Sequence, residues 1–118
     1  MHNEAINLSF KLNTFTEHWS PRTVGVFNGH DLMVVKVKGE FVWRSHADTD
    51  DFFLVIKGKL KVEMRDRTIA LSAGEMYVVP KGIEHRTVAE DEAHLLLIES
   101  TGTPNTGESQ TAAARTLA

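Results

Sequence analysis

Short apolar segments separated by turn residues run along most of this chain, and this pattern limits the folds that it can form. Runs rich in Val, Ile, Phe and Leu predict strands at 23–27, 32–37, 52–56, 60–64, 68–71, 76–79 and 95–98. Glycine turns separate them, and Asn28-Gly29 is typical of a two-residue hairpin that needs positive φ at both positions. Many short strands have to close or cover their sheet edges, so the pattern predicts an all-β sandwich or barrel.

The length of 118 residues corresponds to one domain. We expect an N-terminal arm over residues 1–22, a barrel over 23–100 and a tail over 101–118. Residues 5–16 are predicted to form an extra edge strand, which a second copy could pair with or exchange to give a homodimer. The tail is rich in Thr, Gly, Asn, Ser and Ala, a composition that predicts a flexible segment.

The charge and the cysteine content exclude several classes of function. A formal net charge of −3 gives no electrostatic basis for binding nucleic acid or an anionic membrane. The absence of cysteine excludes disulfides, thiolate catalysis and cysteine-ligated metal sites. The first ten residues lack a basic start followed by an apolar run, and no apolar stretch reaches the length of a membrane span. We therefore expect a cytoplasmic protein whose partner is a small molecule.

Two segments that begin with glycine bring histidines next to predicted strands. The first runs from Gly39 to Asp51 and contains His46. The second reads Gly74, five residues, Pro80, one residue, Gly82, two residues and His85. Each segment thus places a histidine at the start of, or just after, an apolar strand.

These segments resemble the two motifs of the cupin superfamily. The second segment matches its motif closely, with Ala89 in place of the motif's asparagine. The first matches at Gly39, His46 and Gly58, with Asp51 in place of glutamate and Arg44 in place of the first histidine. The chain most resembles small single-domain cupins that are described as mannose-6-phosphate isomerase-like. The resemblance implies a double-stranded β-helix, a jelly-roll type of barrel, over about residues 23–100.

The resemblance also implies a metal site inside the barrel, with His46, Asp51 and His85 as ligands. Two imidazoles and one carboxylate form a facial donor set with open positions, which suits Fe(II) and also Mn, Ni or Zn. Three protein ligands suffice for a catalytic metal, because the remaining positions bind water or substrate. Phe53 shares strand parity with Asp51 and is expected in the pocket wall, and Tyr77 is a candidate ring for holding a sugar-like ligand.

Arg44 is the residue that most affects this interpretation. A guanidinium stays protonated and only donates hydrogen bonds, so it cannot ligate a cation. It could form a bidentate pair with Asp51, which would take the carboxylate that a metal needs. Alternatively, it could reach the pocket mouth and hold a carboxylate or phosphate of a ligand.

Three functions follow from these alternatives. The first is a metal-dependent enzyme, such as a sugar isomerase or a dioxygenase, that acts on a small polar substrate. The second is a metal-free binding or sensing module in which Arg44 pairs with Asp51 or holds an anionic ligand. The third is a purely structural, dimerising barrel. The sequence does not choose among them.

Overall fold

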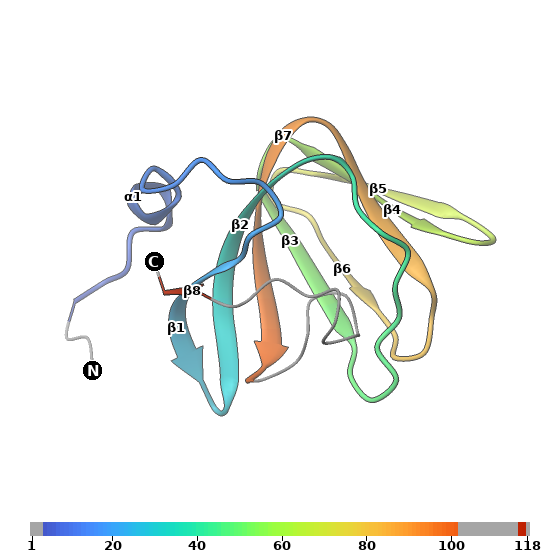
Figure 1. Cartoon of the computed structure of the whole chain (residues 1–118), viewed down its shortest axis with the longest axis horizontal. Coiled ribbons are helices and arrows are strands. Elements are labelled where there is room, and N and C mark those ends of the chain that lie inside the picture. Colours follow the sequence, from blue (N-terminus) through green and yellow to red (C-terminus); the bar gives the residue numbers. More distant parts are fainter. Residues whose placement is uncertain (1–3, 102–115, 118) are drawn as a thin grey trace.

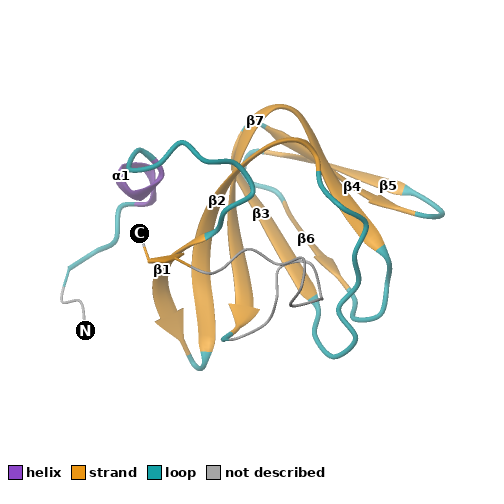
Figure 2. Cartoon of the chain, in the orientation of Figure 1, coloured by secondary structure: helices purple, strands orange, loops and turns teal. Residues whose placement is uncertain are grey.

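One long strand, β7 (His85–Ser100), connects the two halves of the barrel, and it arches over the top of the molecule in Figure 1. The computed structural model describes residues 4–101 and 116–117. The other elements are α1 (Leu8–Leu12), β1 (Arg22–Phe27), β2 (His30–Glu40), β3 (Asp51–Lys57), β4 (Lys59–Met64), β5 (Thr68–Ser72), β6 (Met76–Val79) and β8 (Thr116–Leu117). Strands dominate the described part of the chain (Figure 2), which confirms the predicted all-β class.

The pairing of β7 explains how the sheet closes on itself. One side of β7 pairs antiparallel with β2 over most of its length. Its other side pairs first with β4 and then, further along, with β3. The β2–β7 register slips between Val37 and Gly39, next to the point where β7 turns from β4 to β3. Such a bulge bends a strand, and the result is a jelly-roll type of barrel.

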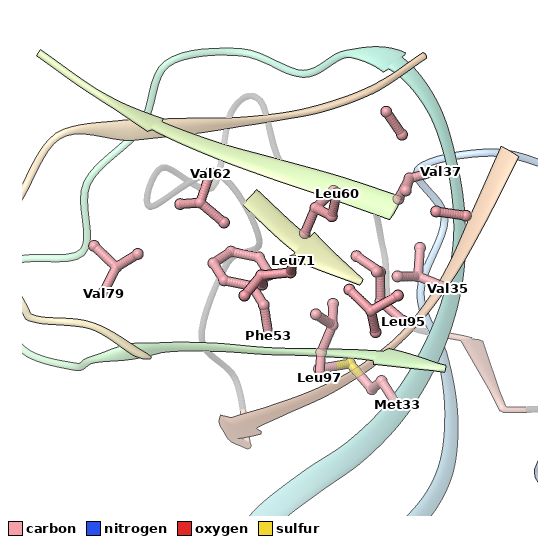
Figure 3. Packing of buried hydrophobic residues seen from close by; sticks show 13 residues of the cluster. Met33, Val35, Val37, Phe53, Leu60, Val62, Leu71, Val79, Leu95 and Leu97 are labelled. Carbon is pink, nitrogen blue, oxygen red and sulfur yellow. The ribbon is translucent and has the colours of Figure 1, made fainter. Parts of the chain in front are cut away.

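Residues at odd positions of the central strands point into the barrel. Along β7, His85, Thr87, Leu95, Leu97 and Glu99 are all buried, and their even-numbered neighbours are more exposed. This alternation is the two-residue period of a strand with one face in the core. The same parity on β2 and β3 supplies much of the rest of the interior, shown in Figure 3: Met33, Val35, Val37, Phe53 and Val55, with Leu60, Val62, Leu71, Val79, Ala89 and Ala93 completing the cluster.

The N-terminal arm differs from the sequence prediction. Residues 5–16 contain the short helix α1 instead of an edge strand, so that prediction is wrong. Asn7 caps the helix, because its side chain accepts a hydrogen bond from the Phe10 amide at 3.0 Å. Leu12 and Phe15 are buried in a second cluster with Val34 of β2, on the outside of the barrel. The arm therefore packs on its own barrel, and the homodimer stays a prediction.

Strand β7 is also longer than the sequence pattern predicts. The sequence indicated a strand only at 95–98, whereas β7 begins at His85. The acidic run 90–92 obscured this strand, because its residues are exposed at the bend of β7.

Of the tail predicted to be flexible, residues 102–115 and 118 lie outside the described residues, and β8 pairs in parallel with the start of β1. No helix of the described chain is long and apolar enough to cross a membrane.

Glu92 ties the arm to β7 from the bend of that strand. His18 Nε2 lies 2.8 Å from one carboxylate oxygen of Glu92, and His94 Nε2 lies 2.9 Å from the other. The adjacent Trp19 amide donates a 2.8 Å hydrogen bond to the Lys36 carbonyl. These contacts fix the position of the Trp19 side chain beside the barrel.

Removing the Glu92 carboxylate should change the acid stability of the protein. Hydrogen bonds from His18 and His94 lower the pKa of Glu92 from 4.5 to about 2. A group with a lowered folded pKa stabilises the fold above its unfolded pKa, and this stabilisation is lost as pH falls through the folded value. We expect E92Q to reduce the pH dependence of unfolding between about pH 4.5 and 2, measured by urea unfolding. If the free energy of unfolding of E92Q depended on pH as that of the wild type does, the contacts of Glu92 with His18 and His94 would not stabilise the fold.

Gly58 should tolerate alanine much less well than Gly74, although both have a φ of +87°. A β-carbon at Gly58 would lie 3.0 Å from the Glu92 carbonyl oxygen, whereas at Gly74 nothing lies within 4 Å. G74A therefore measures the backbone strain alone, about 1–3 kcal/mol. G58A adds a steric term of about 1–3 kcal/mol from overpacking, so it should unfold at a lower urea concentration. Equal decreases in the free energy of unfolding of G58A and G74A would contradict the close approach of β7 to this turn.

Candidate functional site

Arg44 and His85 lie opposite each other because a short β-bridge joins their backbones. The Arg44 amide donates to the His85 carbonyl at 2.8 Å, and the His85 amide donates to the Arg44 carbonyl at 2.9 Å. The His46 carbonyl accepts a 2.7 Å hydrogen bond from the Gly82 amide, in the turn that precedes β7. The two glycine-led segments are thus held together through their backbones, which brings Arg44, His46 and His85 next to one another.

Asp51, the first residue of β3, is the centre of the cluster. Its Oδ2 lies 3.1 Å from Arg44 Nη2, 2.8 Å from His85 Nε2 and 3.4 Å from His46 Nε2. All four side chains are buried. The structure therefore brings together the three residues of the predicted pocket, and it places Arg44 on the same carboxylate oxygen.

The groups around Asp51 determine its ionisation state. Burial raises the pKa of Asp51, but the guanidinium of Arg44 and the adjacent imidazoles of His46 and His85 outweigh it and hold that pKa well below its usual range. Asp51 is therefore ionised at neutral pH. His85 Nδ1 lies 2.8 Å from the Ile83 carbonyl oxygen, and His85 Nε2 lies 2.8 Å from Asp51 Oδ2 and 3.5 Å from Arg44 Nε. These contacts hold the imidazole of His85 beside the carboxylate of Asp51.

Two aromatic rings hold the guanidinium of Arg44 in place. Its central carbon lies 5.0 Å from the centroid of the Phe41 ring and 5.5 Å from that of Phe53. Cation–π contacts at these distances are favourable, more so where the cation is desolvated. Phe53 also packs edge-on against His85, with ring centroids 6.0 Å apart. The buried side chain of Arg44 is thus fixed by an ion pair at its tip and by rings beside it.

Glu99, near the end of β7, is the residue of this site that sequence analysis missed. Its carboxylate, His46 and Asp51 each offer one potential ligand atom, and these three atoms lie within 4.8 Å of one another. The side chain of Glu99 is buried. The strand was predicted to end at residue 98, but the inward parity of Leu95 and Leu97 extends to Glu99 and could have revealed it.

A small pocket opens beside the cluster, with a cavity volume of about 20 Å³, which is room for about one water molecule. Phe53 lines it, as predicted. Tyr77 is not among the lining residues, and its hydroxyl instead accepts a 2.9 Å hydrogen bond from Arg67 Nη2. The lining residues are Trp19, Pro21, Val35, Val37, Phe41, Arg44, Phe53, Thr87, Leu95, Leu97 and Glu99.

The donor set does not fit a divalent cation while Arg44 holds this position. A metal would need the oxygen of Asp51 that accepts from Arg44 Nη2 at 3.1 Å. Arg44 Nε also lies 3.5 Å from His85 Nε2, the nitrogen that would have to offer its lone pair. A guanidinium cannot lose its proton to relieve the repulsion. Only His46 Nε2 has no hydrogen-bond partner among the described residues of this cluster.

The chain is thus a jelly-roll barrel with a buried polar site, which is built from the two glycine-led segments and their histidines. The family model described as Cupin domain matches residues 31–99, and the chain belongs to this family.

Several relatives are similar over most of their length. The chain is 32% identical to protein YdbB of Bacillus subtilis (strain 168) over 82 residues, which cover 69% of this chain and 73% of YdbB. A cupin-2 domain containing protein from Shewanella frigidimarina NCIMB 400 is 48% identical, with a TM-score of 0.79 over 80% of this chain and 93% of that structure. Protein NMB1881 from Neisseria meningitidis is 32% identical, with a TM-score of 0.75 over 83% of this chain and 100% of that structure.

Breaking the buried ion pair from one side should cost about 3–5 kcal/mol, because the remaining charge stays buried without its partner. We expect R44M and D51N each to destabilise the protein on this scale and the double variant to cost less than their sum. Urea unfolding of the four proteins measures the coupling. The exposed pair Arg65–Glu84, 2.7 Å apart, is the matched control, and its coupling should stay below about 1 kcal/mol. Equal coupling for the two pairs would contradict the central role of Arg44.

Proposed function

We propose that this protein is a small-molecule-binding cupin whose site is organised by Arg44 in place of a metal ion. The observation that carries the proposal is the buried contact of 3.1 Å between Arg44 Nη2 and Asp51 Oδ2. It agrees with the metal-free alternative, in which Arg44 closes the metal site and a small ligand binds in the neighbouring pocket. The ligand is then held by hydrogen bonds and apolar contacts.

The balance of buried charges supports this proposal. The permanently charged guanidinium of Arg44 already neutralises the ionised carboxylate of Asp51, 3.1 Å away. This ion pair needs no added ion. A divalent cation would add two positive charges to a buried site next to that guanidinium, at a cost of several kcal/mol or more.

A metal-dependent enzyme is the second candidate, and one observation favours it. The ligand atoms of His46, Asp51 and Glu99 converge within 4.8 Å, and His46 Nε2 has no hydrogen-bond partner in the described structure. If Arg44 moved away from Asp51, this set could hold Fe, Mn, Ni or Zn. Sugar isomerisation, as the likeness to mannose-6-phosphate isomerase-like cupins suggests, and dioxygenation both belong to this candidate.

Metal content after reconstitution separates the two candidates. Wild-type protein would be incubated in turn with Fe(II), Mn(II), Ni(II) and Zn(II), freed of excess metal and analysed by mass spectrometry. We expect far less than one equivalent of metal per chain in the wild type. In R44H/D51E, which has the histidine and the glutamate of the family motif at these two positions, we expect about one equivalent. R44K is the matched control, since it keeps the charge and should bind no metal.

Adding H85A to R44H/D51E tests whether the gained metal uses the predicted ligands, and the metal should then be lost. About one tightly held equivalent in the wild type would overturn the proposal in favour of the enzyme.

A further inference from the structure

The pocket beside Arg44 combines apolar walls with two opposite charges. Arg44 and Glu99 are the charged residues that line it, and Thr87 adds a hydroxyl. The other lining residues are apolar or aromatic, among them Val35, Leu95 and Leu97. A ligand here meets one cation and one anion on an otherwise apolar surface. Its polar group has to satisfy both.

The polar end of the pocket lies close to a further buried group. One ligand atom of Glu99 lies within 4.8 Å of one in His46 and one in Asp51. His46 Nε2 is buried and has no hydrogen-bond partner in the described part of the chain. A buried polar atom without a hydrogen bond destabilises the protein, and a ligand atom or a water molecule that bonds to it would remove that cost. This orphaned nitrogen is an independent sign that a polar group binds at this end.

We infer that the pocket binds the hydroxyl group of a neutral ligand with an apolar body, and that Glu99 determines this specificity by excluding carboxylates. A hydroxyl both donates and accepts, so it can donate to Glu99 and accept from Arg44. Its second lone pair can accept from His46 where Nε2 carries the proton. A carboxylate would lie next to the carboxylates of Glu99 and Asp51, and an ammonium group would lie next to Arg44. The inference rests on the proposed function, because it takes Arg44 to occupy the site.

The size of the pocket agrees with this assignment. A cavity of about 20 Å³ admits a group the size of water, such as one hydroxyl. The body of the ligand has to contact other lining residues, among them the half-buried rings of Trp19 and Phe41, which stack with centroids 4.7 Å apart. These rings offer an apolar contact surface for it.

Three probes that share a six-membered ring test the inference: phenol, benzoate and benzylammonium. Each would be titrated at neutral pH, without and with EDTA, into ¹⁵N-labelled full-length protein, with binding followed by amide shifts around the pocket. We expect phenol to bind at least about tenfold more tightly than either charged probe, a difference of about 1.4 kcal/mol. In E99Q the preference for phenol over benzoate should fall to about threefold or reverse, because Arg44 is then no longer opposed by Glu99.

E90Q is the matched control, since it removes one negative charge from an exposed position of the same strand. It should keep the wild-type preference. The inference is overturned if benzoate or benzylammonium binds the wild type as tightly as phenol, a result that does not depend on the folding of any variant. It is also overturned if E99Q and E90Q show the same preference. Loss of phenol binding on addition of EDTA would instead contradict the proposed metal-free function, so the two failures are distinguishable.

Discussion

The contact between Arg44 and Asp51 is the constraint on which the chemistry of this barrel depends. A guanidinium that cannot deprotonate has been buried, and the fold accommodates it with a carboxylate at its tip and aromatic rings beside it. Asp51 in turn stays ionised and lies 2.8 Å from His85 Nε2. The ion pair of Arg44 and Asp51 is neutral by itself, which makes an added metal ion unfavourable.

The fold delivers these side chains through strand parity and backbone hydrogen bonds. Odd positions of β7 point inward on both sides of its exposed bend at 90–92, so a single strand supplies both His85 and Glu99 to the barrel interior. The bend of β7 at its acidic segment lets the same strand pair with β4 and then with β3. The polar site is thus a consequence of how one strand crosses between the two halves of the sheet.

Much of this could be predicted from the sequence, because its signals are local. The apolar runs and glycine turns indicate the barrel, and the spacing from Gly74 to His85 indicates one half of the site. Glu99 was missed because it lies beyond the apolar run of its strand, and only its register shows that it points inward. The helix in the arm was missed because α1 has five residues, too few for periodicity to show. Whether Arg44 turns toward Asp51 or toward a ligand depends on long-range packing with Phe41 and Phe53, which no local pattern encodes.

Membership of the cupin domain family establishes the fold and where a site lies, but the side chains at that site decide its chemistry. The most direct test of the account is anomalous diffraction from crystals of the wild-type protein soaked in Zn(II), recorded at the zinc edge. The account predicts no anomalous peak among His46, Asp51 and His85, with the Arg44 guanidinium on Asp51. A strong peak bonded to these three residues, with Arg44 displaced from Asp51, would contradict it.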